Sequence, residues 1–548
     1  MSKRGFWMLI VPILITVSIF YLTTIRPGHN WGGDFSLYIH HAKNIVEGIP
    51  YQETGYIYNK NNAYLSPRYY PPIFPLLLTP VYALTGLNLA PMKIEMVIIF
   101  ILFLILYSLS FREQIPSFYR GLAILLVAFN PIFWEFKENI LSEFPFLLFT
   151  YLALYAIQRI EHPQNITKRS IPTAIGIGLL IYLSYGIRTV GGILLPTFLL
   201  YDFIRTRKID FFPVVVSLSF GVFALTQAVL IPGPSGYGDQ ITFSPLILTS
   251  NLILHIYHIL CFLPTFGSTG PALAVTTLFY ILILSAILFG YLLRIKRDFT
   301  IYEVFAPFYL LVIVLWNAAN QGPRFLLPVY PILIFYLIDF VVDTGHVLSK
   351  NKPWGYAVPA CIVVLSFPWS YLRYYATANF NEVPNNFYLP QTMELFDYIR
   401  NNTPQNAVFI FFKPRVLSLY TDRKASACGV WDQPWQLEEC FEQAGMDYIA
   451  IGPNDGCLLD YIHSNPNKFN KIFENNLFSL YRYLNTGQPS SLAMEEAVLR
   501  HNRKIFAKPV LTNKTGISFI MRRTNNTELP PGREFFSVLQ PAGRKFSD

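Results

Sequence analysis

The chain has 548 residues, of which 53% are hydrophobic and only 14% are charged. Soluble domains carry about 25% charged residues, so this composition excludes an ordinary soluble protein and indicates an integral membrane protein. The net charge of +9 would suggest nucleic acid in a soluble protein, but in a membrane protein its distribution among the loops matters more, and we expect no nucleic-acid partner.

Eleven apolar runs, each about long enough to cross the hydrocarbon core of a bilayer, predict a polytopic helical bundle over residues 1–380. No small-residue cleavage site follows the first run, so we expect an uncleaved anchor there. The runs lie near residues 6–25, 93–111, 119–134, 143–160, 171–187, 190–204, 211–231, 268–293, 301–318, 325–342 and 354–372.

Lys and Arg residues are concentrated in alternate loops, and such loops remain on the cytoplasmic side of a membrane. The pattern predicts a cytoplasmic N-terminus, a first outer loop over residues 26–92, and an extracytoplasmic location for everything after about residue 373. Residues 71–89 would invert this pattern if they crossed the membrane. We therefore expect an interfacial helix there, begun by Pro71 and Pro72, with an ordinary transmembrane helix as the alternative.

The sequence from residue 381 onward is typical of a soluble module. "AVFIFF", "MDYIAIG" and "FSLYRYL" indicate strands, whereas "TMELFDYIRNN" and "LEECFEQAG" have helical spacing. Strands that alternate with helices predict an α/β domain over residues 381–485, and the polar tail over 486–548 is expected to be partly mobile. Cys428, Cys440 and Cys457 could hold one disulfide if this domain is extracytoplasmic, but the sequence does not decide whether they do.

The stretch "NWGGDFSLYIHHAKNIVEGIPY", residues 30–51, holds the first acidic residue of the chain, Asp34. Gly32 and Gly33 precede it and let the backbone bend close to a ligand. Tyr38 and the apolar residues after it fall at near-helical spacing, so Asp34 should lie near the start of a short helix on the outer surface. Two interpretations are open: a functional carboxylate, or a helix N-cap, which Asp favours.

The same stretch resembles the first outer loop of the polyprenyl-phosphate-sugar dependent membrane glycosyltransferases of the GT-C fold, which include protein O-mannosyltransferases and aminoarabinose transferases. The matching residues are Asp34, Tyr38, Ala42, Gly48 and Tyr51. "YYPPIFPLLLTPVYALTG", "ENILSEFPFLLFTYLALY" and "NQGPRFLLPVYP" also resemble segments of that family. The resemblance implies a bundle of about eleven transmembrane helices, with outer interfacial helices and a C-terminal extracytoplasmic α/β domain.

The resemblance further implies that a hexose or pentose moves from a polyprenyl-phosphate carrier to a lipid, glycan or protein acceptor at the outer face of a cell (inner) membrane. Inversion would accompany this transfer, with Asp34 as the general base. Glu143 would orient the acceptor or Asp34, while for Glu143 and Glu138 alike the alternative is stabilisation of a helix N-terminus.

Arg324 and Arg188 are the candidates to stabilise the leaving phosphate, because each is the only cation in a short outer loop. The alternative for either is contact with lipid headgroups. Tyr38 and Tyr70 are further candidates for substrate binding.

No cofactor follows from the sequence with certainty, although a divalent metal is possible. Aminoarabinose transferases carry an acid and a Lys where this chain has Tyr69 and Tyr70, which puts their metal site in doubt here. His255 and His258 lie on one face of an amphipathic helix without a third ligand. A transporter or flippase of lipid-linked sugars is the alternative function, but it predicts internal repeats and charges at helix midpoints, and neither is clear.

Overall fold

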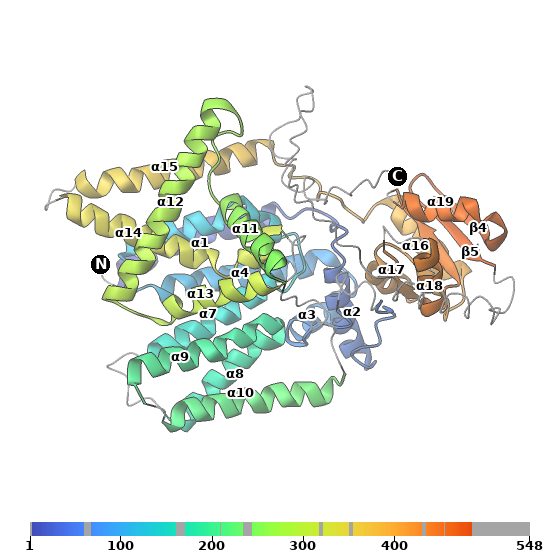
Figure 1. The fold of residues 1–548 in the computed structure, drawn as a ribbon, viewed down its shortest axis with the longest axis horizontal. Helices are drawn as coiled ribbons and strands as arrows, with labels where there is room; N and C mark the ends of the chain where they lie inside the picture. Colours follow the sequence, from blue (N-terminus) through green and yellow to red (C-terminus); the bar gives the residue numbers. More distant parts are fainter. Residues whose placement is uncertain are drawn as a thin grey trace, which may run out of the picture.

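The computed structural model describes residues 3–59, 67–160, 170–208, 210–233, 244–316, 322–349, 354–429, 434–453 and 455–484. A helical bundle is followed by a small domain that contains a β-sheet (Figure 1). The bundle consists of α1 (Lys3–Thr23), α2 (Asp34–Glu47), α3 (Ile73–Thr85), α4 (Leu89–Ser110), α5 (Ser117–Ala128), α6 (Pro131–Phe136), α7 (Glu143–Ile160), α8 (Ile171–Ile187), η3 (Thr189–Ile193), α9 (Leu194–Thr206), α10 (Phe211–Leu230), α11 (Pro245–Cys261), α12 (Gly270–Arg297), α13 (Ile301–Leu315), η5 (Gly322–Leu326), α14 (Tyr330–Ser349) and α15 (Trp354–Thr377).

Each of the eleven apolar runs contains helix in this structure. By length and composition, three helices of the described residues are long and apolar enough to cross a membrane, namely α4, α10 and α12. Six shorter apolar helices of 10–17 residues accompany them. The structure thus confirms an apolar helical bundle, whereas the number of eleven crossings stays a prediction.

Polar residues define where several of these helices begin. The side chains of Asn88, Asn130 and Asp210 each accept a hydrogen bond from a backbone N–H in the first turn of α4, α6 and α10. Such caps satisfy N–H groups that have no partner inside the helix. Local sequence therefore contributes to where these helices start.

Aromatic side chains fill the centre of the bundle between α4, α7 and α14. Phe100 and Phe144 stack with ring centroids 4.6 Å apart. The hydroxyls of Tyr107 and Tyr151 donate hydrogen bonds to the carbonyl oxygens of Pro331 and Pro328, at 2.8 Å and 3.2 Å. A buried tyrosine needs such a partner, so these bonds fix α4 and α7 against the start of α14.

Helices α2 and α3 lie at the side of the bundle that faces the sheet domain (Figure 1). Helix α3 has 13 residues, which corresponds to a length of about 20 Å, whereas the hydrocarbon core of a bilayer measures about 30 Å. Its length thus fits the interfacial helix expected for residues 71–89.

The C-terminal domain, residues 390–484, contains α16 (Pro390–Asn402), β1 (Val408–Ile410), α17 (Pro414–Thr421), β2 (Lys424–Ser426), α18 (Pro434–Ala444), β3 (Tyr448–Ile451), α19 (Gly456–Ser464), η6 (Pro466–Lys468), β4 (Phe469–Glu474) and β5 (Ser479–Tyr483). The strand order is β2-β1-β3-β5-β4. Strand β1 pairs in parallel with β2 and β3, and β5 pairs antiparallel with β3 and β4. The predicted strands coincide with β1, β3 and β5, while the tail over 486–548 lies outside the described residues.

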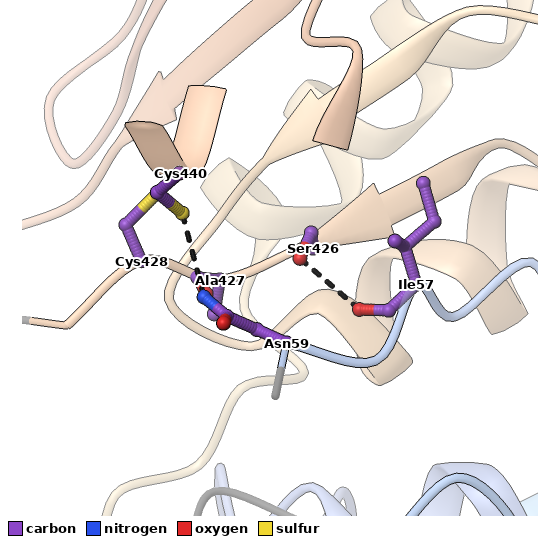
Figure 2. The surroundings of a disulfide bond; sticks show 6 residues. All are labelled: Ile57, Asn59, Ser426, Ala427, Cys428 and Cys440. Atoms are coloured by element: carbon purple, nitrogen blue, oxygen red, sulfur yellow. Dashed lines mark hydrogen bonds between the residues drawn. A yellow bond between two sulfur atoms is a disulfide. The ribbon is translucent and has the colours of Figure 1, made fainter. Parts of the chain in front are cut away.

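The segment that follows α2 joins the C-terminal domain along the edge of its sheet. The backbone N–H of Ile57 donates to the carbonyl of Ala425 at 2.8 Å, and the N–H of Ala425 donates to Gly55 at 2.9 Å. Figure 2 shows that Ser426 donates to the carbonyl of Ile57, at 3.0 Å, and that Asn59 lies beside the disulfide. This segment extends the sheet beyond β2 in the manner of an added strand.

A disulfide joins Cys428 to Cys440, which settles a question that the sequence left open (Figure 2). Cys457 is a free, exposed cysteine. The bond ties the segment after β2 to α18, directly beside the place where the segment after α2 is attached.

Candidate active site

Asp34 is the first residue of α2, and the N-cap position is taken by Gly33. No side-chain hydrogen bond caps the helix, so the interpretation of Asp34 as an N-cap is wrong. Its carboxylate binds two guanidinium groups instead. Both Nη atoms of Arg324 donate to Oδ2 at 3.0 Å, and Nη2 of Arg415 lies 3.1 Å from Oδ1.

Gly33 allows this arrangement through its backbone and its size. Its φ angle of 77° belongs to the left-handed region that L side chains rarely adopt. A Cβ atom at this position would also lie 3.0 Å from Nη2 of Arg415. The glycine before the carboxylate therefore sets the entry into α2 and leaves space for the second guanidinium.

Glu143, the first residue of α7, bridges two arginines. Its Oε1 lies 2.6 Å from Nη1 of Arg188 and 3.3 Å from Nε of Arg324, and its side chain is only 3% exposed. None of these ion pairs joins Glu143 directly to Asp34. Glu143 therefore acts on Asp34 through Arg324, which pairs with both carboxylates. A buried carboxylate with two cationic partners holds both guanidinium groups in fixed positions.

Arg324 and Arg188 come from short segments between helices. Arg324 lies in η5 and Arg188 follows the last residue of α8. Each guanidinium lies near the ring of Phe325, at 5.3 Å and 5.2 Å from its centroid. Both guanidinium groups form an ion pair with the buried carboxylate of Glu143, which favours a role inside the protein over contact with lipid headgroups.

Tyr38 and Tyr70 complete the group of predicted residues. Their rings stack at 4.2 Å, and the Tyr38 hydroxyl donates to Ser142 at 2.9 Å. The Tyr70 hydroxyl accepts a hydrogen bond from Nη1 of Arg415 at 3.1 Å and is also bonded to Asp34. The structure therefore brings together all six residues that the sequence singled out for catalysis or substrate binding.

Arg415 is the member of this group that sequence reasoning missed. It lies at the start of α17, in the C-terminal domain, and only 8% of its side chain is exposed. A basic residue at the start of a short helix in a soluble module is normally solvated, so burial of this one was not expected from the local sequence. The adjacent residues "KPR", with two cations around a helix-starting proline, are the only local signal.

Electrostatics in the group keep Asp34 ionised. Burial by itself acts to raise the pKa of Asp34, but the charges of Arg324 and Arg415, with hydrogen bonds from Tyr70 and Arg324, outweigh it and hold the pKa well below its usual range. The three guanidinium groups face two carboxylates, which leaves an excess of one positive charge. This site can therefore attract an anion such as a phosphate.

The donor set does not fit a metal centre. Both carboxylates, Asp34 and Glu143, are neutralised by guanidinium groups, which a divalent cation would have to displace. Tyr69 points elsewhere, since its hydroxyl donates to the carbonyl of Gly233 at 2.5 Å. In the described part of the chain, no group of three or more His, Cys, Asp or Glu side chains is arranged to hold a metal ion.

Two other polar groups lie apart from this site. Glu138 is ion-paired with Lys93, at 2.8 Å, and with Lys137, in a separate buried network that links α4 to the end of α6. His255 bonds to the carbonyl oxygen of Ile313 at 3.0 Å, so it joins α11 to the end of α13. Both groups therefore have structural partners within the bundle.

Neither a comparison with models of protein families nor a comparison with curated protein sequences finds a match. Solved structures do match. The oligosaccharyltransferase AglB from Archaeoglobus fulgidus, in complex with an inhibitory peptide and a dolichol-phosphate, is 13% identical, with a TM-score of 0.55 over 82% of this chain and 70% of that one. ArnT from Cupriavidus metallidurans, bound to undecaprenyl phosphate, is 11% identical, with a TM-score of 0.51 over 89% of this chain and 100% of that one. The chain therefore shares the GT-C fold with these two proteins, as the resemblance of its first outer loop implied.

Proposed function

We propose that the protein is a membrane glycosyltransferase that moves a sugar from a polyprenyl-phosphate carrier to a lipid, glycan or protein acceptor. The observation that carries this proposal is the ion-paired group of Asp34, Arg324, Glu143 and Arg188 between the helical bundle and the C-terminal domain. A carboxylate to accept a proton and fixed guanidinium groups to stabilise a phosphate are what such a transfer requires. The similar AglB and ArnT structures contain dolichol-phosphate and undecaprenyl phosphate, which supports a lipid-phosphate donor.

The proposed step is a single displacement at the anomeric carbon of the donor sugar. The acceptor oxygen forms a bond to this carbon while the bond from the carbon to the phosphate oxygen breaks, and the electron pair of that bond leaves with the phosphate. Asp34 takes the proton of the acceptor, an effect worth typically about 10²- to 10⁴-fold in rate. Because attack and departure occur on opposite faces, the configuration is inverted.

Arg324 and Arg188 stabilise the charge that develops on the leaving phosphate. Both are fixed by Glu143, so little reorganisation is needed when the carbon–oxygen bond breaks. A guanidinium offers N–H donors in a rigid planar fork, which suits two phosphate oxygens at once. Glu143 is thus a positioning residue that acts through the two arginines.

The membrane arrangement follows from the loop charges and is supported by the disulfide. Disulfides form and persist outside the cytoplasm, so the Cys428–Cys440 bond favours an extracytoplasmic C-terminal domain. With a cytoplasmic N-terminus, the site would lie at the outer face of a cell (inner) membrane. The lipid carrier would reach the site from the surrounding membrane, and the acceptor would reach it from the aqueous side.

The sugar-transfer activity of the Asp34→Asn variant tests this proposal. Membranes from cells that express the wild type or the variant at equal levels are incubated with total isoprenoid-linked radioactive sugars, and transfer to lipid, glycan and protein acceptors is measured. We expect transfer to be lost while carrier binding persists. Asp397→Asn is the matched control, because Asp397 lies on α16 with 63% of its side chain exposed. Unchanged transfer by Asp34→Asn would overturn the proposal and reopen the transporter interpretation.

A further inference from the structure

Two cations of the C-terminal domain, Lys413 and Arg415, approach Asp34 from the side opposite the helical bundle. Arg415 contacts Oδ1 of Asp34 at 3.1 Å. Lys413 is half-buried and close enough to interact electrostatically with both Asp34 and Arg415. Within the described ranges of the chain, its ammonium group makes no hydrogen bond or ion pair. A half-buried cation without a partner has lost part of its hydration and gained no anion in return.

The contacts of Asp34 leave it no oxygen that is clear of a guanidinium group. Oδ2 accepts from both Nη atoms of Arg324, and Oδ1 faces Arg415. A carboxylate in this state is a poor proton acceptor, since its charge is already neutralised. Withdrawal of one of the two arginines would therefore make Asp34 a stronger base toward the proton of an acceptor.

The two arginines differ in what else holds them. Arg324 is bound to Glu143 through Nε, at 3.3 Å, in addition to Asp34, so the bundle fixes it from two sides. Arg415 also donates to the hydroxyl of Tyr70 at 3.1 Å, and its contact with Asp34 is an ion pair. Displacement of Arg324 would break two hydrogen bonds to Asp34 and disturb the pair with Glu143, whereas displacement of Arg415 from Oδ1 leaves Arg324 and Glu143 in place.

Resting on the proposed function, we propose that Lys413 and Arg415 bind the carrier phosphate, and that Arg415 transfers from Oδ1 of Asp34 to a phosphate oxygen as the carrier binds. Oδ1 then becomes free to accept the proton of the acceptor. With Lys413 included, four cations face two carboxylates, an excess of two positive charges. A phosphate monoester carries about −1.5 to −2 at neutral pH, so this excess matches the leaving group more closely than the donor diester, which carries one negative charge.

This exchange would couple occupancy of the donor site to the activity of the base. Asp34 would be held inactive by Arg415 until a phosphate arrives, and water entering an empty site would meet a carboxylate that cannot take its proton. The C-terminal domain would accordingly contribute to the donor site itself, in addition to any role in acceptor choice.

A binding experiment separates this inference from the question of transfer. The dissociation constant of a fluorescent polyprenyl phosphate is measured with the full-length protein in mild detergent, for the wild type, Arg415→Gln, Lys413→Gln, Asp34→Asn and the double variant of Asp34 and Arg415. Arg482→Gln is the matched control, because Arg482 is exposed on β5 of the same domain. Lys413→Gln removes no hydrogen bond or ion pair of the described chain, so it keeps the test valid if Arg415→Gln fails to fold.

We expect Arg415→Gln to weaken binding about 10- to 100-fold and Lys413→Gln about 3- to 10-fold, as loss of a charge-assisted hydrogen bond and of a nearby charge would do. Asp34→Asn should tighten binding about 10-fold, because it removes the anion that competes for Arg415. In the Arg415→Gln background this tightening should fall below about 3-fold, since only general repulsion between Asp34 and the phosphate is then relieved.

The inference fails if both Arg415→Gln and Lys413→Gln bind the lipid as tightly as Arg482→Gln. It also fails if Asp34→Asn tightens binding equally in the two backgrounds, because Arg415 would then not be the shared partner. If one of these two binding results is found while the wild type transfers sugar normally, the inference fails and the proposed function stands. If the variants show the expected affinities for polyprenyl phosphate but the wild type transfers no isoprenoid-linked sugar, the proposed function fails and the phosphate site stands.

Discussion

Replacement of Glu143 by Gln tests whether the two bundle arginines act as a unit. Oε1 of Glu143 lies 2.6 Å from Arg188 and 3.3 Å from Arg324, and its side chain is 3% exposed. Each charged contact that is lost costs about 1.5–3 kcal/mol. The arginines are partly exposed, at 16% and 21%, so solvent reduces this cost, and we take about 2–4 kcal/mol in total. At about 1.36 kcal/mol per tenfold change, transfer should fall about 30- to 1000-fold.

The assay measures sugar transfer in membranes, divided by the amount of folded protein determined by size-exclusion chromatography in detergent. Glu138→Gln is the control, because Glu138 is equally buried but is paired with Lys93 and Lys137, away from Asp34. We expect Glu138→Gln to lower the midpoint of thermal unfolding and to leave transfer per folded molecule within about twofold, while Glu143→Gln lowers both. If Glu143→Gln transfers as well as Glu138→Gln, the arginines do not depend on Glu143 and the reasoning is refuted.

Three further changes have definite expected outcomes. Gly33→Ala and Gly48→Ala each place a side chain at a positive φ, 77° and 68°, so each variant should lose about 1–2 kcal/mol of stability. Only Gly33→Ala should also impair transfer, because a Cβ at position 33 lies 3.0 Å from Arg415, whereas nothing lies within 4 Å of a Cβ at position 48. Equal transfer by the two variants would contradict this. Burial lowers the pKa of His41 to about 3, below its unfolded value of about 6.5, so its contribution to stability is complete above pH 6.5 and is lost as the pH falls toward 3. At pH 5 the loss amounts to about 2 kcal/mol, and the midpoint of thermal unfolding should fall between pH 7 and pH 5 by less in His41→Gln than in the wild type. Reduction of the disulfide, which spans 12 residues in sequence, should destabilise the C-terminal domain by about 3 kcal/mol and speed its cleavage by added protease, and unchanged protection would show that the bond is dispensable.

The residues of the site that could be predicted share a simple property. Asp34, Arg188 and Arg324 stand out because charged residues are scarce in short outer loops next to membrane helices, so each needs a reason to be there. Arg415 has no such contrast, since its surroundings in the sequence are polar. Its burial depends on a contact with Tyr70, which lies 345 residues earlier in the chain. Local sequence patterns carry no information about contacts between residues so far apart in sequence.

The same reasoning explains the elements that were missed. Strand β2 has only three residues, Lys424–Ser426, and β4 reads "FNKIFE", in which charged and polar residues interrupt the alternation. Each is defined by its neighbours: β2 by pairing with β1, and β4 by pairing with β5. The helix-start preference of Asp34 was a correct local signal, but two guanidinium groups outcompeted the backbone N–H groups for its oxygens.

The order in which the site residues occur along the chain sets the time at which the site can first exist. Asp34 and Arg324 are separated by 290 residues, and Tyr70 and Arg415 by 345 residues. At about 5–20 residues per second, synthesis leaves Asp34 without Arg324 for roughly 15–60 s, and Arg415 arrives later still. A nascent chain, or one truncated before residue 415, thus lacks part of the constellation, so the complete group of charges can assemble only after the C-terminal domain has been synthesised.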